Sequence, residues 1–504
     1  MAKTEGVRRR RSRRASSHPL LLFLLILLCS AELASAWILD VKSKFSGRNR
    51  SISDFKAHDS RRQVSLLPGV DLPLGGTGRA DGVGLYYAKI GIGTPSKDYY
   101  VQVDTGSDIM WVNCIQCTEC PTKSSLGIEL TLYDIKESVT GHLVPCDTKF
   151  CHEVHNGPVY GCTTNMTCSY IEMYGDESST IGYFVKDNVQ YDKVSGDLNT
   201  TAANGSLIFG CGARQSGPLT SSYEALDGIL GFGNTNSSAI SQLAASGVVK
   251  NMFAHCLDGV NGGGIFAIGH VVQPQVNTTS LIPNQTHYSV YMKSIEVGNK
   301  TLNISTDVLG AGKNKQGAII DSGTTLAYLP RKIFDPLLNE IFSQHTDMKI
   351  YPIEDQYTCF RYSDSIDDAF PNVTFHFDNS LYFNVQPHEY LFAKEHMWCL
   401  GWQNSGNQTR DRQDMILLGD LVLSNKLVFY DLEKQVMGWT EYNCSSSIQV
   451  QDEQTGTVHL IGPHPIAAAN ASSNSQSLEL SVLAFLITLL HIFMAELLEQ
   501  SVQR

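Results

Sequence analysis

The sequence predicts an all-β protein built from two similar halves, and three observations support this expectation. Only 17% of the 504 residues are charged, while 42 are Gly and 17 are Pro, a balance typical of turn-rich β proteins rather than helical ones. Hydrophobic residues make up 42% of the chain, which allows a large core and excludes a disordered protein. A short acidic motif also occurs twice, each time after an apolar strand-like run, as a duplicated lobe would produce.

The chain is acidic once its N-terminus is set aside. The formal net charge is −12, but residues 1–36 contain seven Lys or Arg and only two Asp or Glu. The remaining chain holds 31 basic and 48 acidic residues, a net charge of −17. Such a body repels phosphate, so the composition excludes nucleic acid as a partner.

The N-terminus has the pattern of a secretory signal peptide. A basic run at residues 8–14 precedes an apolar stretch at residues 20–28 and an Ala-Ser-Ala sequence that ends at Ala36. We therefore expect a signal peptide over residues 1–36, with cleavage after Ala36. A retained signal anchor is the alternative, but nine apolar residues are too few to span a bilayer.

Residues 37–78 are polar, show little periodicity and contain the dibasic pair Arg61-Arg62. In a secreted protein we interpret this segment as a propeptide or leader, which would make the protein a zymogen. An ordinary N-terminal extension is the alternative that the sequence leaves open.

Cysteine and sequon counts agree with export. Of 13 Cys, Cys29 would leave with the signal peptide, and the other 12 are consistent with six disulfides. Cys114, Cys117 and Cys120 have a metal-like spacing, but in an oxidising compartment we interpret them as disulfide-bonded. Thirteen N-x-S/T sequons predict a glycosylated surface. We expect no metal and no other cofactor.

A second hydrophobic segment lies at the C-terminus. Residues 480–495 contain one ionisable side chain, His491, and as a helix they would extend about 24 Å, less than the roughly 30 Å of a hydrocarbon core. The small, polar residues 467–474 precede this segment, and the combination is typical of a GPI-attachment signal. The polar residues 499–504 at the end of the chain argue against such a signal. A type I membrane anchor and a buried C-terminal helix are the alternatives.

Strand patterns dominate the middle of the chain. Residues 86–92 and 99–103 are rich in aromatic and β-branched residues, with a Gly-Thr-Pro turn at residues 93–95 between them. The clearest helical pattern covers residues 330–345, where apolar residues recur on one face, although Pro336 interrupts its first turn.

Two short segments share an acidic motif. Within residues 101–107, an apolar strand-like run is followed by Asp-Thr-Gly-Ser. Within residues 318–324, another such run is followed by Asp-Ser-Gly-Thr. Each is followed by an apolar-apolar-Gly segment, at residues 229–231 and 417–419. A single Asp-Thr-Gly is most simply a β-turn. Two motifs in matching strand context, 217 residues apart, predict a duplicated lobe.

These motifs resemble those of the pepsin-type aspartic proteases. The segment from Asp104 to Trp111, paired with the segment from Asp321 to Thr325, carries the resemblance, which covers about residues 80–446. The Cys-rich insert after Trp111 is similar to that of the plant, nepenthesin-like branch. The two ends of the chain are similar to those of its membrane-tethered members.

The resemblance implies a bilobal, all-β, pepsin-like acid protease fold, with two β-barrel-like lobes and an active-site cleft between them. We place the N-terminal protease lobe at residues 79–280 and the C-terminal lobe at residues 281–446. A polar stalk is expected at residues 447–477, followed by the GPI signal or membrane anchor at residues 478–504.

Two carboxyls that share one proton can hydrolyse an amide without a metal or a covalent intermediate. The charged member activates a water as general base, and the protonated member donates to the carbonyl oxygen. Like charges about 3 Å apart cannot both ionise readily, so one pKa of a close pair falls, the other rises, and the pair holds one proton at acid pH. The resemblance assigns this catalytic pair to Asp104 and Asp321.

The resemblance also implies roles for the neighbours of the two aspartates. Gly106 and Gly323 allow two backbones to approach closely, because they have no Cβ. Ser107 and Thr324 are expected to hydrogen-bond the outer carboxyl oxygens or the nearby backbone.

A polar, Gly-containing stretch at residues 174–179 lies between strand-like runs and is interpreted as a hairpin. It is similar to the family's flap, which makes Tyr174 the residue expected to close over substrate and exclude water. Trp111 lies seven residues after Asp104, at the family's position for the tryptophan that supports the flap. Core packing is the alternative role for both side chains.

We therefore expect an aspartic endopeptidase with an acid pH optimum that acts on protein or peptide substrates. It would be a monomer in the secretory pathway, held by a GPI or helix anchor at the extracellular face of the cell membrane. The alternative is a catalytically inactive binding or inhibitor module with the same fold.

Overall fold

The computed structural model describes residues 69–76, 86–310, 317–353, 357–394, 396–407, 414–452 and 456–463. The expected signal peptide, most of the leader and the hydrophobic segment 478–504 lie outside these ranges. The described residues all belong to the larger of the two compact units of the chain, Ser65–Arg504. Within them, no helix is both long and apolar enough to cross a bilayer.

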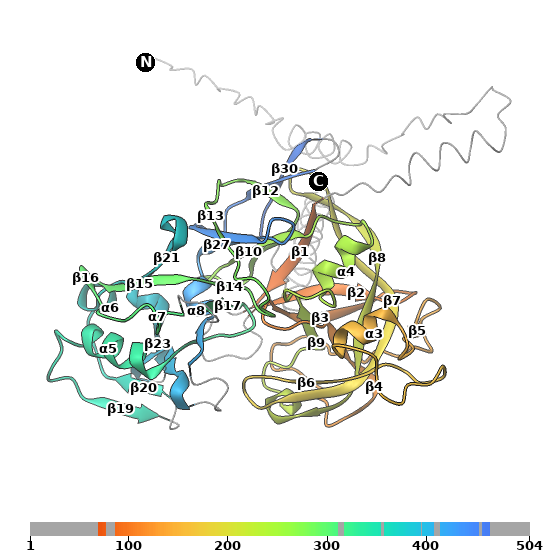
Figure 1. Ribbon diagram of the computed structural model, residues 1–504, viewed down its shortest axis with the longest axis horizontal. Coiled ribbons are helices and arrows are strands. Elements are labelled where there is room, and N and C mark those ends of the chain that lie inside the picture. Colours follow the sequence, from red (N-terminus) through yellow and green to blue (C-terminus); the bar gives the residue numbers. More distant parts are fainter. Residues whose placement is uncertain are drawn as a thin grey trace, which may run out of the picture. The chain divides into compact units, whose positions relative to one another are not determined.

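The first half of the chain forms most of one 14-stranded sheet, which β27 and β28 from the second half complete (Figure 1). Three short helices lie outside this sheet. The strands of the first half are β1 (Val70–Gly75), β2 (Tyr87–Ile92), β3 (Lys97–Asp104), β4 (Trp111–Thr118), β5 (His142–Leu143), β6 (Ser169–Met173), β7 (Ser179–Gly196), β8 (Asn199–Ser216), β9 (Gly228–Gly231), β10 (Met252–Leu257), β11 (Gly264–Ile268), β12 (His270–Gln273) and β13 (Thr278–Ser280), and its helices are α3 (Lys149–Val154), η1 (Gly217–Thr220) and α4 (Ala239–Ala245).

The second half contains one five-stranded and two four-stranded sheets. The helix expected at residues 330–345 is present as α5, with Pro336 inside it. The strands are β14 (Ser289–Val290), β15 (Met292–Val297), β16 (Lys300–Thr301), β17 (Ala318–Ile320), β18 (Ala327–Leu329), β19 (Ile350–Ile353), β20 (Tyr357–Phe360), β21 (Val373–Phe377), β22 (Tyr382–Val385), β23 (Leu391–Lys394), β24 (Met397–Leu400), β25 (Trp402–Asn404), β26 (Ile416–Leu418), β27 (Lys426–Asp431) and β28 (Val436–Glu441), and the helices are α5 (Arg331–Ile341), α6 (Ile366–Ala369), η2 (Asp378–Ser380), α7 (Pro387–Tyr390), η3 (Ser405–Asn407) and α8 (Asp420–Leu423).

The two halves repeat one strand arrangement around the acidic motifs. In the first half, β3 pairs in parallel with β9, and β4 pairs with β9 antiparallel. In the second half, β17 pairs in parallel with β26, and β18 pairs with β26 antiparallel. In each half, the first strand leads into the Asp motif and its parallel partner leads through the apolar-apolar-Gly segment, so the duplicated lobe expected from sequence is confirmed.

The lobes are joined through the large sheet. β27 pairs antiparallel with β10 over five residues, from Met252 opposite Asp431 to Cys256 opposite Leu427. Every residue of both strands is buried, because the sheet is covered on its two faces. A strand of the second half is therefore part of the core of the first.

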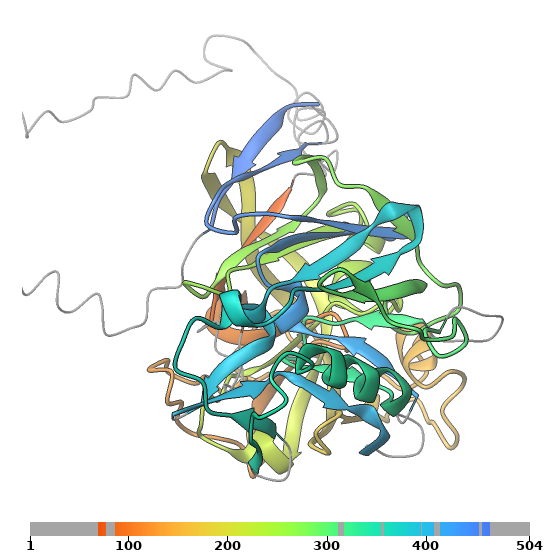
Figure 2. The same ribbon diagram turned by 90° about the vertical axis from the view of Figure 1, so that its left-hand side faces the viewer.

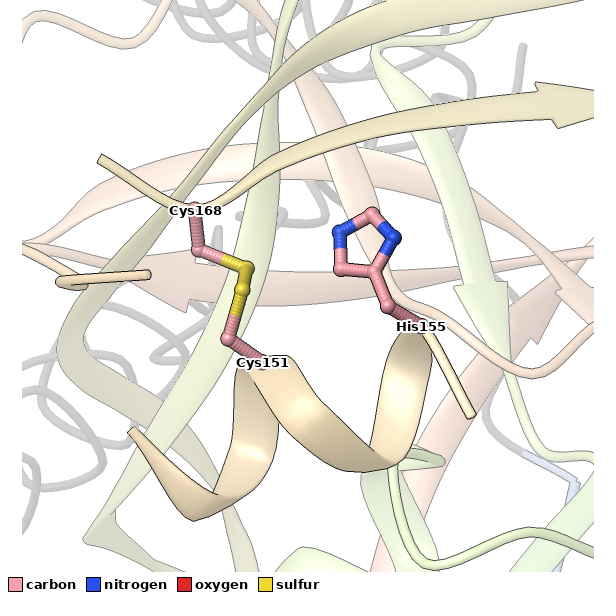
Figure 3. A group of neighbouring side chains, drawn as sticks. All are labelled: Cys151, His155 and Cys168. Carbon is pink, nitrogen blue, oxygen red and sulfur yellow. A yellow bond between two sulfur atoms is a disulfide. The ribbon is translucent and has the colours of Figure 1, made fainter. Parts of the chain in front are cut away.

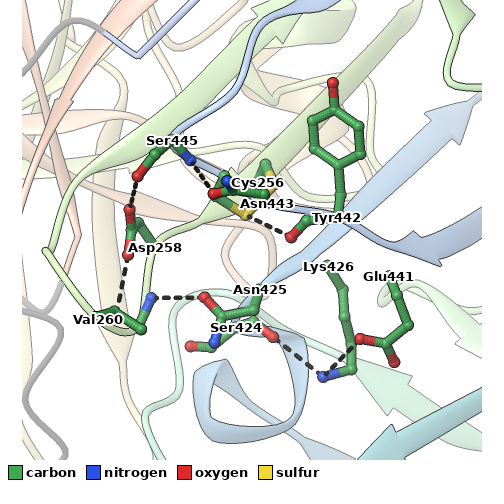
Figure 4. The surroundings of a disulfide bond; sticks show 12 residues. Cys256, Asp258, Val260, Ser424, Asn425, Lys426, Glu441, Tyr442, Asn443 and Ser445 are labelled. Carbon is green, nitrogen blue, oxygen red and sulfur yellow. Dashed lines mark hydrogen bonds and ion pairs between the residues drawn. A yellow bond between two sulfur atoms is a disulfide. The ribbon is translucent and has the colours of Figure 1, made fainter.

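Six disulfides are present, as the cysteine count predicted. Three of them lie within the Cys-rich insert, a fourth joins Cys114 at its start to Cys211 in β8, and Cys256–Cys444 fastens the segment after β28 to β10. Beside it, Ser445 Oγ and the Val260 N–H both donate to Asp258, at 2.6 and 2.9 Å (Figure 4). The disulfides are Cys114–Cys211, Cys117–Cys120, Cys146–Cys162, Cys151–Cys168, Cys256–Cys444 and Cys359–Cys399.

The structure differs from the expected boundaries at both ends of the protease body. Residues 70–75, assigned to the leader, form β1 between β11 and β2. Residues 447–477, assigned to a polar stalk, contain β29 (Ile448–Gln451) and β30 (Val458–Ile461), which form a three-stranded sheet with β12 (Figure 1, Figure 2). Both segments bury apolar side chains, such as Val70 and Ile448, against strands far away in the sequence.

Candidate active site

The two acidic motifs meet where the halves of the chain join. Asp104 ends β3 and Asp321 follows β17, and both side chains are buried. A Cβ placed on Gly106 would lie 2.5 Å from Asp321 Oδ1, and one on Gly323 would lie 2.0 Å from Asp104 Oδ1. Each carboxyl therefore packs against the glycine of the opposite motif, which only a residue without a side chain permits. This is the close approach expected of Gly106 and Gly323.

Backbone and side-chain donors hold Asp104 in place. Its Oδ1 accepts hydrogen bonds from the Gly106 N–H at 2.8 Å and from the Ser107 N–H at 3.1 Å. The Ser107 hydroxyl also lowers the pKa of Asp104, although within the described residues its oxygen makes no well-formed hydrogen bond. The bond that Ser107 makes to the carboxyl of Asp104 in this structure is therefore that of its backbone N–H.

Asp321 is held in a similar way. The Gly323 N–H donates to Asp321 Oδ1 at 2.8 Å, and Thr324 Oγ1 donates to Oδ2 at 2.7 Å. Both oxygens are therefore engaged, and the contact expected of Thr324 is present. The turn after each strand supplies these donors, because consecutive N–H groups point back to the aspartate.

Thr105 and Ser322 link the two motifs directly. The Ser322 N–H donates to Thr105 Oγ1 at 2.9 Å, and the Thr105 N–H donates to Ser322 Oγ at 3.3 Å. The Ser322 hydroxyl donates in turn to the Val103 carbonyl at 3.4 Å. These bonds cross 217 residues of sequence, so they fix the register of one lobe on the other.

Burial, followed by the charge of Asp321, raises the pKa of Asp104 from 3.8 to about 7. Two carboxyls in mutual contact cannot both lose their protons at low cost. The pair therefore retains one proton through the acid and weakly acid range, and that proton belongs to the pair rather than to one residue.

The raised pKa of Asp104 predicts how stability depends on pH. Between about pH 4 and pH 7 the folded protein holds a proton that the unfolded chain, with a carboxyl pKa of 3.8, has released. We expect the free energy of unfolding to be highest near pH 4 and to fall by a few kcal/mol as the pH rises to about 7. Urea unfolding of wild type and Asp104→Asn checks this, because the amide cannot titrate and its curve should be flatter. If the free energy of unfolding changes with pH equally in the two proteins, groups other than Asp104 cause the change.

A third carboxyl, that of Asp420, lies next to the second motif, where the Asp420 N–H donates to the Thr324 carbonyl at 2.8 Å, and it was missed by the sequence analysis. It is fully buried at the start of α8, and burial, then the charges of Asp321 and Asp104, raise its pKa well above the usual range. A carboxyl of this kind stays protonated and neutral. The sequence does contain a sign of this residue. An aspartate directly follows the Leu-Leu-Gly segment at residues 417–419, whereas Phe232 follows the matching segment of the first lobe.

The predicted hairpin is present and reaches the pair. Tyr174 follows β6, and its N–H donates to the Ser178 carbonyl at 2.9 Å, which closes the turn into β7. Burial, then the charge of Asp104, raise the pKa of Tyr174 well above its usual range, so its phenol lies beside the pair. Trp111 Nε1 donates to this phenol oxygen at 2.6 Å. Both side chains therefore lie at the site.

The tip of the hairpin extends toward the second lobe. The charge of Asp176, in the turn, raises the pKa of Tyr328 on β18 after the larger effects of burial and Tyr357. Because electrostatic effects of this kind fade with distance, the turn and β18 lie near each other.

The metal-like grouping of Cys151, His155 and Cys168 has a different explanation. Their ligand atoms lie within 4.8 Å of one another, but Figure 3 shows the two sulfur atoms bonded to each other. Disulfide sulfur is not the thiolate that binds metal ions. His155 Nε2 lies 2.9 Å from the Ser169 carbonyl oxygen instead, which ties α3 to β6.

A surface pocket of about 420 Å³ lies elsewhere, on the second lobe. It is lined by polar residues after α5 and by Tyr351 and Arg361. None of its lining residues hydrogen-bonds to the acidic motifs, so the chemistry of the site does not depend on it.

Comparisons with known proteins agree with this site. Residues 86–270 match the family model "Xylanase inhibitor N-terminal", and residues 287–441 match "Xylanase inhibitor C-terminal". The chain is 46% identical to Aspartic proteinase 36 of Arabidopsis thaliana over 458 residues, 91% of this chain and 94% of that protein. It is 45% identical to Aspartic proteinase 39 of the same plant over 440 residues, 87% of this chain and 91% of that protein. Nepenthesin-2 of Nepenthes gracilis is 26% identical over 381 residues, 73% of this chain and 79% of that protein.

Solved structures share the fold at lower identity. Basic 7S globulin from soybean superposes with a TM-score of 0.57 at 19% identity, covering 74% of this chain and 96% of its own. The protein named edgp superposes with a TM-score of 0.58 at 20% identity, covering 75% and 96%. The bilobal, all-β, pepsin-like fold is thus confirmed. With both acidic motifs in contact and two relatives near 45% identity, this chain belongs to the plant aspartic proteinase family that includes Aspartic proteinases 36 and 39.

Proposed function

We propose that this protein is an aspartic endopeptidase that hydrolyses peptide bonds with a water held between Asp104 and Asp321. The observation that carries the proposal is the reciprocal packing of each carboxyl against the opposite glycine, Gly323 or Gly106. It brings two acids from different lobes into one buried site with one shared proton, which is what metal-free amide hydrolysis requires.

The site residues divide the work of the reaction. The charged member of the pair takes a proton from water as the water attacks the carbonyl carbon, and the protonated member donates to the carbonyl oxygen. The donors from Gly106 and Gly323 hold the carboxyls in position, so little reorganisation is needed during the reaction. In the second step the protonated member gives its proton to the leaving nitrogen, the other member takes one from a hydroxyl of the tetrahedral intermediate, and the C–N bond breaks. The carboxylic acid and the amine leave, and the pair is again singly protonated.

The expected pH dependence follows from the shared proton. Activity should be highest at acid pH and should fall as the pH rises through about 7, where the pair loses that proton. An extended peptide would bind across the junction through its main chain, with large hydrophobic side chains on either side of the cleaved bond. Tyr174 would lie over the bound peptide and exclude water.

The test uses the full chain produced in a secretory host. We expect turnover of a quenched fluorescent peptide at pH 4, little turnover at pH 8, and inhibition by a statine-containing peptide, whose hydroxyl imitates the tetrahedral intermediate. A folded protein that neither cleaves denatured proteins at any pH between 3 and 7 nor binds the statine peptide would contradict the proposal.

One observation favours a second candidate, a catalytically inactive inhibitor or binding module. Both matching family models are described as xylanase inhibitor domains, and the solved structures of the same fold include a seed globulin. The intact site residues argue against inactivity, since Asp104, Ser107, Tyr174, Asp321 and Thr324 are all present. Binding of a xylanase without peptide cleavage would favour the inhibitor.

We further propose that the enzyme is a glycosylated monomer made as a zymogen and held at the extracellular face of the plasma membrane. The six disulfides support an oxidising compartment. Ten sequon asparagines in the described residues have exposed side chains, which glycosylation requires. A GPI anchor predicts release from intact cells by a phosphatidylinositol-specific phospholipase, and retention would instead favour a spanning helix.

Removing the flap tyrosine is expected to impair catalysis. Tyr174→Ala loses both the ring that covers the pair and the partner of Trp111 Nε1, so kcat/KM should fall by about 100-fold. Steady-state kinetics at pH 4 measures this loss. Tyr160→Ala is the matched control, because Tyr160 is fully exposed in the Cys-rich insert and should change kcat/KM less than twofold. If kcat/KM is the same for the two variants, Tyr174 takes no part in catalysis.

A further inference from the structure

The pocket of about 420 Å³ on the second lobe lies between the segment that follows α5 and the β19–β20 hairpin (Figure 1). Its walls come from residues 344–349, after α5, and from Tyr351 and Arg361 of the hairpin. Its volume falls in the range of about 300 to 1,000 Å³ that binding sites for small ligands occupy. Most such sites are largely apolar, whereas polar and charged side chains line this one, which suits a polar ligand.

Two cations line this pocket from the same end of the hairpin. β19 pairs antiparallel with β20, and its first residue, Ile350, lies opposite Phe360, the last residue of β20. Lys349 comes directly before this pair and Arg361 directly after it, so the register places the two cations next to each other. Like charges next to each other across two strands destabilise a sheet, so this arrangement is costly unless an anion lies beside them.

The charge of these two cations is not neutralised by the protein. In the part of the chain that the structure describes, neither Lys349 nor Arg361 pairs with an acid, not even with Asp347, which lines the same pocket. Other cations of this lobe do find acids, as Lys293 does at 2.7 Å from Asp378. After residue 36 the chain has 48 acidic and 31 basic residues, so acids are not scarce. Two neighbouring cations without one therefore leave their charge available to a ligand.

His345 gives the pocket a hydrogen-bond acceptor in a fixed place. Its Nε2 lies 2.9 Å from the Ala369 carbonyl oxygen, and its ring centroid lies 4.7 Å from that of Phe370. The His345 carbonyl also accepts from the Met348 N–H at 3.0 Å. A carbonyl oxygen can only accept, so Nε2 carries the hydrogen and, in the neutral ring, Nδ1 carries a lone pair. Among the described residues Nδ1 has no partner, so it can accept a hydrogen from a ligand.

The mixture of groups in the pocket selects the kind of ligand. Arg361 has paired N–H donors that match the two oxygens of a carboxylate, and Lys349 adds a second positive charge. Asp347 and His345 Nδ1 are acceptors, which need hydroxyl hydrogens from the ligand. An anion without hydroxyls, such as sulfate, would satisfy the cations but repel the Asp347 carboxylate. Tyr351, 40% exposed, adds an aromatic ring against which the apolar face of a sugar can pack.

We propose that this pocket is a ligand-binding site separate from the carboxyl pair, and that its ligand is a sugar acid, a hydroxylated ring that carries a carboxylate. Arg361 and Lys349 bind the carboxylate. Asp347 and His345 accept hydrogen bonds from the ring hydroxyls, and the apolar face of the ring packs on Tyr351. The site makes no use of the two acidic motifs, so it does not depend on the proteolytic function proposed above, and either proposal can fail without the other.

The test is a ligand-observed NMR titration of the full chain with glucuronate and with glucose, at pH 7 and low ionic strength, where charge pairs are screened least. The two sugars share a ring and differ in the carboxylate. We expect glucuronate to bind with a Kd of about 1 mM and glucose to bind at least about tenfold more weakly. Equal binding of the two sugars, or no binding of glucuronate up to about 20 mM, would overturn the proposal.

Variants locate the binding in this pocket. Arg361→Ala should weaken glucuronate binding at least about tenfold, and Arg361→Lys about threefold, because lysine keeps the charge but lacks the paired donors. Lys332→Ala is the matched control and should leave binding unchanged. Lys332 is an exposed cation on α5 that does not line the pocket and forms no ion pair within the described ranges. If Lys332→Ala weakens binding as much as Arg361→Ala does, glucuronate is attracted by surface charge in general and the pocket is not its site.

Competition experiments test the ligand class and the location. Sulfate at the concentration of glucuronate should displace little of it, and equal displacement would show a site for any anion, which overturns the proposal. The statine-containing peptide should displace none, and displacement would place the sugar beside the carboxyl pair and overturn the proposal too. A glucuronate tetramer that binds at least about tenfold more tightly than the monomer identifies a polysaccharide as the source of the ligand, and equal affinity identifies the free sugar acid.

Discussion

Asp104→Asn and Asp321→Asn are each expected to lower kcat/KM by about 1,000-fold or more. Each substitution removes one carboxyl from a pair in which one member must accept a proton and the other donate one. The amide keeps the shape of the side chain but can do neither reliably, so the remaining carboxyl ionises without its partner. Steady-state kinetics with a quenched peptide at pH 4 measures the loss.

The matched control is Asp98→Asn, which lies on the same strand as Asp104. Its side chain is exposed and pairs with Lys89 at 2.7 Å, an interaction that contributes under about 1 kcal/mol at a surface. The control should retain wild-type kinetics. Folding of the active-site variants is checked by their unfolding midpoints, which should not be lower than that of wild type at pH 7, because a buried charge is lost. If either active-site variant turns over peptide at the wild-type rate, the carboxyl that it lacks is not needed for the reaction.

Gly323→Ala is expected to abolish activity almost as completely, through a single methyl group. The added Cβ would lie 2.0 Å from Asp104 Oδ1, far inside van der Waals contact. The Gly323 backbone is held by its N–H bond to Asp321, so the methyl group can be accommodated only if the two motifs move apart. Separation by even one ångström breaks the shared-proton geometry, and we expect kcat to fall by at least about 100-fold.

Gly196→Ala controls for the loss of glycine itself. A Cβ on Gly196, at the end of β7, would meet its nearest atoms at 3.8 Å, an ordinary contact. This variant should have wild-type kinetics and stability. A pH profile adds a second readout, since Gly323→Ala should also lower the pH at which the pair loses its shared proton. Unchanged kcat in Gly323→Ala would mean that the carboxyls work without the close packing.

Local features of the fold could be predicted because their causes are local. The strands at residues 86–92 and 99–103 were recognisable from β-branched and aromatic residues around a Gly-Thr-Pro turn, and they are β2 and β3. The helix expected at residues 330–345 is α5, somewhat shorter. The number of disulfides followed from counting cysteines. In each case a few adjacent residues, or composition alone, carried the information.

β1 and the β29–β30 hairpin could not be predicted, because their stability comes from distant partners. β1 is short, contains Pro73, and is held by pairing Val70 with Ile268 in β11. β29 pairs with β12 and β30, and Ile448 and Val450 are buried against the large sheet. Sequence alone made both segments look like polar connections, since no local pattern shows which edge of a sheet is open.

The candidate site divides in the same way. Asp104, Asp321 and their neighbours stand in motifs that the sequence displays twice, so they could be named beforehand. Asp420 directly follows the second apolar-apolar-Gly segment, but that position alone does not show that its side chain lies at the site. Its proximity to the second acidic motif became visible only in the folded structure, where its N–H donates to the Thr324 carbonyl at 2.8 Å.

By itself, the sequence determined that the chain has two homologous halves, each presenting an acid after a buried strand, and an even number of cysteines after residue 36. Only the tertiary structure decided that the two motifs meet, that each carboxyl packs against the glycine of the opposite motif, and that hydrogen bonds between Thr105 and Ser322 join the lobes. The physical reason is that strand and turn propensities act over a few residues. Burial, close approach and shared protons arise only between surfaces that folding brings together.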